Sequence, residues 1–373
     1  MYLKEKIILL VSPQEWSDFY ISKHNYAIEL ASLGNQVIFM NPPKKGKSIG
    51  GELIPTSFDC LNVLEYSTFF PSAIRFHSFF LYTLLVRIQL FTLRKKLPSK
   101  IDIVWCFEPN LFPKLNWFNA KYRIYHPVDF LTNKRQVNVG KTAHVIFSVA
   151  DNILQLFDEL SMPKYFVNHG LSEYYLNAKV NYSGINPQRP LKFAYIGSLF
   201  IPGLDRSSLK KVIERFNNVE FDFYGIYLRE KNVSHEMQLF IDFLIDTPNV
   251  NLMGVVHPKE LSIKLKEYDG FLVCYNPSKE LNSGSNSHKM LEYLSLGKVI
   301  ISSKIKTYEH LGDEILMSKK EDNSDYSSLF EFAVKNMEHL NSPELFEKRR
   351  NISIENSYKA QIQKIDKILC NHL

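Results

Sequence analysis

The 373-residue sequence lacks any apolar run long enough to cross a membrane. A spanning helix needs about 18 or more consecutive apolar residues, and no stretch reaches that length. Near the start, MYLKEKIILLVSP contains an apolar run of only about five residues, which a Ser-Pro turn ends, so it differs from a secretory signal peptide. These two absences lead us to expect a cytoplasmic protein.

Cysteine is scarce, with four residues at Cys60, Cys106, Cys274 and Cys370. None forms a C-x-x-C pair and no Cys/His group has metal-ligand spacing, so the sequence offers neither a disulfide framework nor a zinc site. Cys106 and Cys274 lie in apolar, strand-like runs. We therefore expect both to be small buried hydrophobic residues.

The chain has no long Lys/Arg block of the kind found in nucleic-acid-binding proteins. Lys and Arg total 45, Asp and Glu total 39, and the net charge of +6 is spread along the chain. This balance fits a phosphate-bearing ligand or an anionic membrane, while the missing Lys/Arg block disfavours nucleic acid. No G-x-G-x-x-G follows the first expected strand, which disfavours a dehydrogenase.

What the chain does contain is apolar and aromatic material for two domains. Hydrophobic residues make up 45%, with 27 Phe and 20 Tyr. Strand Ile7–Val11, a helix from Ser22 to Leu33 and strand Val37–Asn41 form a βαβ opening, and the alternation restarts at Lys192–Ile196 after a polar, proline-containing stretch. The fold class is therefore α/β, with two facing Rossmann-like, doubly wound domains and a ligand cleft between them. We expect domains at 1–176 and 191–345, a linker at 177–190, and a helical segment at 346–373 that packs back on the first domain.

The segment Ser283–Gly297 is the strongest candidate for a binding site. A loop of small polar residues leads directly into a helix, whose first N–H groups and dipole attract anions. Lys289 in the first turn adds a point charge for a pyrophosphate, and Glu292 on the same face is placed to accept hydrogen bonds from a ribose diol. The alternative is a Ser/Asn helix cap with a surface Lys289–Glu292 ion pair, because such caps are common.

This segment resembles the donor-site signature of two-domain GT-B glycosyltransferases of the family 4 type, in the branch that reads S-N-P-x-K-x-x-E-Y-L-A-x-G-K-P-V. The corresponding residues here are Ser285, Asn286, Ser287, Lys289, Glu292, Tyr293, Leu294, Ser295, Gly297, Lys298 and Val299. The resemblance implies that Lys289 contacts the donor phosphates and that Glu292 binds the ribose. It also implies a sugar-nucleotide donor, no cofactor and no obligatory metal. From position we add His288 to the donor-binding set.

One departure from the family pattern concerns the donor sugar. The family usually carries two glutamates with seven residues between them, and the first would stand at position 284, which is Gly284 here. Glu280 is a nearby candidate for the missing contact. The identity of the sugar and the stereochemistry of transfer therefore stay open.

Three further stretches match the donor half of the pattern. KFAYIGS, residues 192–198, resembles its first strand, with Gly197 turning towards the pyrophosphate. The usual Arg after that glycine is absent, and Arg206 is the candidate replacement. VNLMGVV, residues 250–256, resembles the strand and turn that frame the base, so we expect contacts from Gly254 and Val255. For each glycine alone, an ordinary tight turn is the simpler explanation.

The acceptor-side candidates lie in the N-terminal half. His126 and Asp129 end an expected strand, where related enzymes place a His beside the donor sugar, so both are catalytic candidates. His126 could be a hydrogen-bond donor or a proton relay. Asp129 could be the base for the acceptor hydroxyl. Glu15, Trp16 and Glu108 follow strands and are expected to face the acceptor. A structural turn at His126 and loop packing of Trp16 are the alternatives.

Phe69–Lys96 is very apolar and is interrupted by basic residues. A helix that is apolar nearly all round is usually buried, and burial is the expectation here; contact with an anionic membrane is the alternative.

Together these features predict a hexosyltransferase-type glycosyltransferase. It would move a sugar from a UDP- or GDP-type donor to a hydroxyl of a glycan or lipid-linked saccharide, as in bacterial-type surface polysaccharide assembly. Retention is favoured by analogy with the family alone. A sugar-nucleotide epimerase of the same fold and a non-catalytic binding subunit stay open as alternatives. The expected location is the cytoplasm, with peripheral contact at the inner face of the membrane left open.

Overall fold

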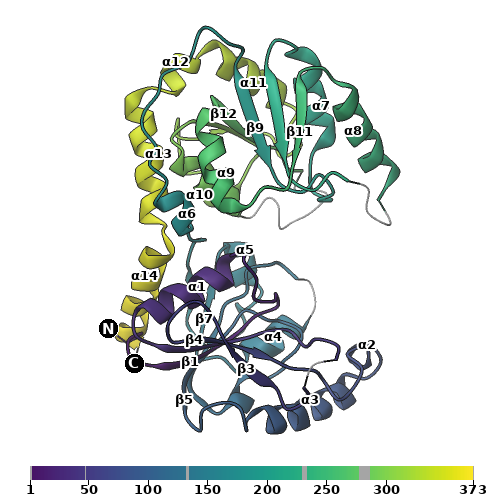
Figure 1. The fold of residues 1–373 in the computed structure, drawn as a ribbon, viewed down its shortest axis with the longest axis vertical. Coiled ribbons are helices and arrows are strands. Elements are labelled where there is room, and N and C mark those ends of the chain that lie inside the picture. Colours follow the sequence, from purple (N-terminus) through teal and green to yellow (C-terminus); the bar gives the residue numbers. More distant parts are fainter. Residues whose placement is uncertain (1, 47, 132–133, 229–232, 277–285, 373) are drawn as a thin grey trace. The chain divides into compact units, whose positions relative to one another are not determined.

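The computed structural model describes residues 2–46, 48–131, 134–228, 233–276 and 286–372 (Figure 1). The chain divides into two compact units: Met1–Asn168 with Tyr358–Leu373, and His169–Ser357. Each unit is built on one mostly parallel sheet with helices on both faces, which confirms the predicted α/β class and the two Rossmann-like domains. Segment 177–190 falls within the second unit, and segment 346–373 is divided between the two.

The first unit contains an eight-stranded sheet in the order β3-β4-β2-β1-β5-β6-β7-β8. Neighbouring strands pair in parallel, except that β3 runs antiparallel to β4. The central strands are nearly continuous apolar runs because both faces of the sheet are covered. The strands are β1 (Ile7–Val11), β2 (Gln36–Met40), β3 (Glu52–Pro55), β4 (Leu61–Glu65), β5 (Ile101–Cys106), β6 (Ala120–Tyr125), β7 (Val145–Ser148) and β8 (Lys164–Phe166).

Two hydrophobic cores cover the two faces of this sheet. Alternate residues of β1 point to opposite faces, so Leu9 and Val11 enter one core while Ile8 and Leu10 enter the other. The first core includes α3, and the second includes α1 and the C-terminal helix α14. The helices are α1 (Ser22–Ser32), α2 (Ile74–His77), α3 (Phe79–Leu93), η1 (Leu115–Phe118), α4 (Lys134–Gly140), α5 (Asp151–Gln155) and α14 (Tyr358–His372).

The second unit contains a six-stranded, wholly parallel sheet in the order β11-β10-β9-β12-β13-β14. The strands are β9 (Lys192–Ile196), β10 (Glu220–Tyr224), β11 (Val250–Gly254), β12 (Gly270–Val273), β13 (Val299–Ser302) and β14 (Leu316–Met317). Sheet order changes direction at β9, whose neighbours are β10 on one side and β12 on the other. Ligands of such sheets bind at the carboxyl ends of the strands beside this point.

Helices cover both faces of the second sheet as well. Helices α7, α8 and α11 contribute to one core, and α6, α9 and α10 contribute to the other. The helices are α6 (Glu173–Leu176), α7 (Arg206–Arg215), α8 (His235–Asp246), α9 (Pro258–Lys264), η2 (Leu265–Glu267), α10 (His288–Ser295), η3 (Lys306–Tyr308), α11 (Tyr326–Lys335), α12 (Met337–Leu340) and α13 (Pro343–Glu355).

The expected burial of Phe69–Lys96 is wrong for one whole face of this segment. Phe80 is 83% exposed and Phe91 is 68% exposed, whereas Tyr82, Val86 and Leu93 of the same helix are buried. Helix α3 lies on the sheet with one face only, so its outer face keeps its apolar side chains in solvent. None of the helices in the described parts of the chain combines the length and apolar character required to span a membrane.

Candidate functional site

Two glycines at the carboxyl ends of β9 and β10 form a tight backbone ridge in the second unit. Gly197 has φ +141° and Gly225 has φ +146°, conformations that side chains rarely adopt. A Cβ on Gly225 would lie 2.1 Å from the carbonyl oxygen of Gly197, so the two strand ends approach as closely as backbone allows. Gly225 N–H donates to the carbonyl of Gly254 at 2.8 Å, which joins the end of β11 to the same ridge.

Lys289 reaches this ridge from the first turn of α10. A Cβ on Gly197 would lie 2.2 Å from the Lys289 Nζ, so only glycine leaves room for the ammonium. Nζ donates to the hydroxyl of Tyr275 at 2.6 Å and lies 5.0 and 5.2 Å from the ring centres of Tyr195 and Tyr275. Burial alone would lower the pKa of Lys289, but the two tyrosines outweigh it and the pKa is raised. The amine is therefore a fixed positive charge beside the backbone of Gly197.

Glu292, one turn further along α10, has a different electrostatic environment. Burial raises the pKa of its carboxyl to about 7, although the charge of Lys289 and a hydrogen bond with Tyr175 act to lower it. Lys289 and Glu292, both described, are not within ion-pair distance of each other, so the alternative of a surface ion pair is not realised. A carboxyl in this state has unused acceptor capacity for a diol.

The position of α10 is fixed by Tyr293. Its hydroxyl accepts a hydrogen bond from the N–H of Ile196 at 2.8 Å, and its ring stacks on Phe271 at 4.4 Å. This contact attaches the helix to the end of β9, which is why Lys289 meets Gly197.

The loop before α10 is only partly described. Ser285 and Gly284, like Glu280, lie outside the described residues. Ser287 is the N-cap and is buried, but its side chain makes no capping hydrogen bond, so the simple Ser-cap alternative is not realised at this residue. Asn286 is half-buried, and the ring of His288 lies 3.6 Å from that of His169. The helix start thus keeps backbone donors that the Ser287 hydroxyl does not occupy.

Of the two other donor-binding candidates, Arg206 is buried and Val255 is exposed. Arg206 is buried, and its guanidinium donates to the carbonyls of Leu199 and Ile201 at 2.7 and 2.8 Å, so it holds the loop after β9. Val255 is 60% exposed beside Gly254, which has φ +71°. The donor-binding roles of both stay predictions.

His126 in the first unit is fully buried at the end of β6. Its ring stacks on Phe107 at 4.8 Å and meets Tyr26 edge-on at 5.4 Å. The indole N–H of Trp105 donates to Nδ1 at 3.3 Å. Since an indole can only donate, Nδ1 is unprotonated and the proton of the neutral ring is on Nε2. Nε2 has no partner among the described residues, and burial lowers the pKa of His126 to about 3.

Lys23, in the first turn of α1, is a candidate that the sequence did not reveal. It is 4% exposed, and burial lowers the pKa of its amine although the charges of Asp129 and Glu108 act to raise it. Glu108 is also buried, and burial raises the pKa of its carboxyl while Oε1 accepts from the N–H groups of Asn110 and Leu111. Asp129 is exposed. The topology therefore places His126 and these three ionisable groups at the carboxyl edge of the first sheet.

Trp16 and Glu15 make contacts that support the first βα loop. The ring of Trp16 lies 5.0 Å from Phe39, and its backbone N–H donates to Asn41 at 2.8 Å. Glu15 pairs with Lys44 at 3.0 Å. These contacts match the alternative of packing within the loop, and acceptor contact by either residue stays a prediction.

Solved structures share this fold along the whole chain. An α,α-trehalose-phosphate synthase (UDP-forming) from Burkholderia vietnamiensis matches with a TM-score of 0.69 at 9% identity, covering 98% of this chain and 99% of its own. A sucrose-phosphate synthase from Thermosynechococcus elongatus matches at 0.69 and 8%, covering 99% and 100%. Anabaena HepE in complex with UDP and glucose matches at 0.67 and 10%, covering 98% and 99%.

The sequence itself matches no family model and no curated protein. At these identities the structural matches establish the fold, and the predicted GT-B fold is confirmed. Among the described residues, no three His, Cys, Asp or Glu side chains are grouped as a metal would require.

Proposed function

We propose that this protein is a glycosyltransferase that uses a nucleotide-diphosphate sugar. The observation that carries the proposal is the ammonium of Lys289, fixed between two tyrosines against Gly197 at the carboxyl edge of the second sheet. A fixed cation beside backbone at a helix start is suited to a diphosphate. Glycosyltransferases that share the fold, one of them solved with UDP and glucose, support the same chemistry.

In the proposed reaction the bond between the sugar C1 and the diphosphate oxygen breaks, and C1 bonds to the acceptor oxygen. Lys289 and the N–H groups at the start of α10 stabilise the charge that develops on the leaving diphosphate. Glu292 holds the ribose, and the backbone at Gly254 and Val255 faces the base. The acceptor proton goes to Asp129, and the nucleotide diphosphate leaves. We propose retention at C1 by analogy with the family.

His126 takes a narrower role than the sequence suggested. Because its pKa is lowered to about 3, it is neutral at physiological pH and is a poor proton relay. Its Nε2–H is a fixed hydrogen-bond donor, and we propose that it donates to a hydroxyl of the donor sugar. For the acceptor we propose a hydroxyl of a glycan or lipid-linked saccharide, as in bacterial-type surface polysaccharide assembly, with the protein in the cytoplasm and in peripheral contact with a membrane.

The test is incubation of the full-length protein with a panel of UDP- and GDP-sugars, with and without saccharide acceptors. Release of nucleotide diphosphate that depends on an acceptor, with formation of a glycoside, supports the proposal. An isomerised donor would instead identify an epimerase, and tight binding without turnover would identify a non-catalytic subunit. Absence of binding to every sugar nucleotide would overturn the donor site itself.

A further inference from the structure

Residues 66–101 form the most one-sidedly charged stretch of the first unit. They contain six Lys or Arg residues and no Asp or Glu. The six are Arg75, Arg87, Arg94, Lys95, Lys96 and Lys100. This stretch includes α2 and α3, so a helix with an exposed apolar face also carries an unbalanced positive charge.

Buried polar contacts fix which face of α3 turns outwards. The hydroxyl of Tyr82 donates to the carbonyl of Leu111 at 3.0 Å, and the amide of Gln89 donates to the carbonyl of Ile49 at 2.8 Å. The opposite face presents a stripe at helical spacing, here called the α3 stripe, consisting of Phe80, Leu84, Ile88 and Phe91. These four side chains are 83%, 49%, 48% and 68% exposed, and at 1.5 Å per residue they extend over about 17 Å.

Cations surround this stripe at both ends. Beside the N-terminal end of α3, Arg135 lies 5.6 and 6.0 Å from the rings of Phe76 and Phe79, and Phe76 is 69% exposed. Beyond the C-terminal end follow the exposed residues Arg94, Lys95 and Lys96. An amphipathic surface of aromatic side chains flanked by Lys and Arg has the composition that binds to the interface of an anionic bilayer.

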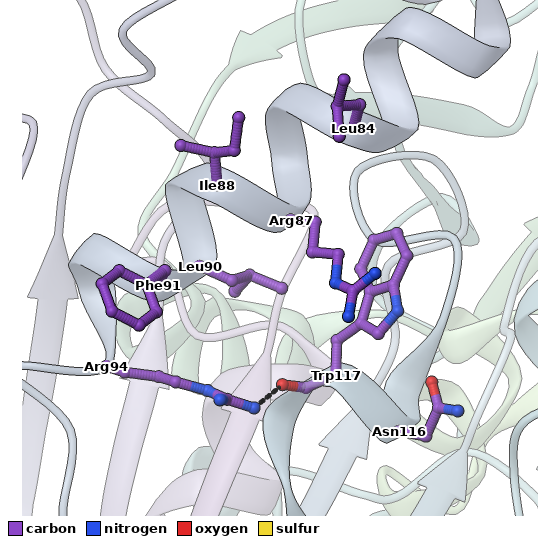
Figure 2. A pocket seen from close by; sticks show the side chains of 8 residues that line it. All are labelled: Leu84, Arg87, Ile88, Leu90, Phe91, Arg94, Asn116 and Trp117. Carbon is purple, nitrogen blue, oxygen red and sulfur yellow. Dashed lines mark hydrogen bonds between the residues drawn. The ribbon is translucent and has the colours of Figure 1, made fainter.

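A cavity of about 540 Å³ lies beside the C-terminal half of α3, between α3 and η1. Arg87 and Arg94 extend from α3 towards η1, which carries Trp117 (Figure 2). Arg94 donates to the carbonyl of Trp117, whereas Arg87 makes no ion pair or hydrogen bond within the described part of the chain. The lining also includes Leu84, Ile88, Leu90, Phe91 and Asn116 and contains no carboxylate.

We propose that the α2–α3 surface binds the interface of a bilayer that contains anionic phospholipid, and that the α3–η1 cavity holds one lipid phosphate. The phosphodiester would bind Arg87 and Arg94, and the acyl chains would lie along the α3 stripe. The indole of Trp117 suits the headgroup level, where amphipathic rings concentrate. This proposal does not depend on sugar transfer.

Charge favours a lipid over a second copy of this chain as the occupant. A symmetric pair would bring together two surfaces that each carry an excess of Lys and Arg and, over residues 66–101, no acidic residue, which is unfavourable. An anionic bilayer instead supplies both hydrocarbon and phosphate. Exposed apolar residues also occur on α8, at Leu239 and Ile245, but that helix contains Glu236, Asp242 and Asp246. It therefore provides an internal control with similar apolar exposure and the opposite charge.

The test is co-sedimentation of the full-length protein with vesicles of phosphatidylcholine alone and with 30% phosphatidylglycerol. We expect binding to the anionic vesicles only, with a loss in 0.5 M salt because screening shortens the electrostatic range. Phe80→Ser with Phe91→Ser should lower binding at least tenfold, and the control Leu239→Ser with Ile245→Ser should leave it unchanged. Equal binding to neutral vesicles, no binding at all, or full binding by the Phe80/Phe91 variant would overturn the proposal. So would a dimer, seen by light scattering, that the same variant abolishes.

The phosphate position has its own matched pair. Loss of one basic residue near an anionic surface weakens binding about fivefold, whichever residue it is. Arg87→Gln removes a cavity cation, and Lys95→Gln removes a cation outside the cavity lining. We expect Arg87→Gln to weaken binding to the anionic vesicles clearly more than Lys95→Gln does. Equal losses would exclude a phosphate-binding site in the cavity. Retained UDP binding by each variant would show that the second unit is intact and would separate this result from a failure of the proposed transferase activity.

Discussion

Two lysines at the carboxyl edges of the two sheets show how differently similar topologies treat a cation. Lys289 in the second unit lies over two tyrosine rings and has a raised pKa. Lys23 in the first unit has a smaller exposed fraction than Lys289, and burial lowers the pKa of its amine. The neighbouring tyrosines therefore stabilise the charge of Lys289, whereas burial disfavours the charge of Lys23.

The same contrast holds for the acids and the histidine. At the first edge His126 is neutral and Glu108 has a raised pKa, and both are buried. At the second edge Glu292 has a pKa of about 7 and is only half-buried, so it can respond to a ligand. These two kinds of environment match the charged donor and the uncharged sugar hydroxyl of the proposed reaction.

The largest expected difference between the two units is in the cost of a Gly→Ala substitution to the free energy of unfolding. Gly225→Ala places a Cβ 2.1 Å from the carbonyl oxygen of Gly197, and backbone cannot yield cheaply, so we expect a loss of about 3–5 kcal/mol in the free energy of unfolding. The control in the first unit is Gly34→Ala, which has φ +82° and open space, and should cost about 1–2 kcal/mol. Chemical denaturation measures both, and similar losses would mean that the ridge is less tightly packed than described.

The two lysines provide the next test. Lys289→Met should weaken binding of a sugar nucleotide about 10- to 100-fold, the usual effect of a charged hydrogen bond. Lys23→Met, which replaces a buried amine by an apolar chain of similar length, should leave donor affinity unchanged. Isothermal titration calorimetry with UDP-sugars measures both. Unchanged affinity in Lys289→Met would remove this lysine from the donor site.

Much of the fold could be predicted because its strands are buried apolar runs with sharp ends. Strands β1 and β9 begin and end at the residues expected from the sequence. Strand β3 was not expected, since ELIP is a short antiparallel edge strand with mostly exposed residues. The burial of α3 was predicted wrongly because composition shows that a helix is apolar but not how much of it the sheet covers.

The candidate site could be predicted less completely. Lys289 and Glu292 were found from a local motif, since both lie on one short helix. Tyr175, Tyr195 and Tyr275, which set their charge states, come from distant segments and carried no local signal. Gly225 had no motif either, and its importance appears only when β9 and β10 are paired.

A pH series should show the smaller effect of Glu292. If the ribose binds the carboxylate form, donor affinity rises about tenfold between pH 6 and 8, because the pKa is about 7. Glu292→Gln should remove this rise, and comparison with the wild type cancels titration of the nucleotide. Equal pH dependence in both proteins would contradict the ribose role.

The contribution of Glu292 to the stability of the folded protein should fall as the pH rises, opposite to its effect on donor affinity. The pKa of Glu292 in the folded protein is raised above its ordinary value of 4.5, so the stability linked to its proton is present below pH 4.5 and is lost as the pH rises to about 7. Glu292→Gln should therefore raise the melting temperature relative to the wild type at pH 8 but not at pH 4. A thermal shift at the two pH values measures this, and an equal shift at both would contradict the raised pKa.

The smallest expected effect is on the pH dependence of turnover when His126 is replaced. A neutral Nε2–H donor has no titration near pH 7, so His126→Phe should lower turnover about tenfold, by loss of one hydrogen bond, without altering the profile between pH 5 and 8. Phenylalanine keeps the packing against Phe107 and Tyr26, which separates the hydrogen bond from the ring contacts. If turnover is unchanged, His126 is a packing residue only. If the wild-type profile instead shows an inflection near pH 6–7 that His126→Phe lacks, His126 titrates in the working protein. Burial would then not keep this ring neutral, and the contrast between the two sheet edges would fail.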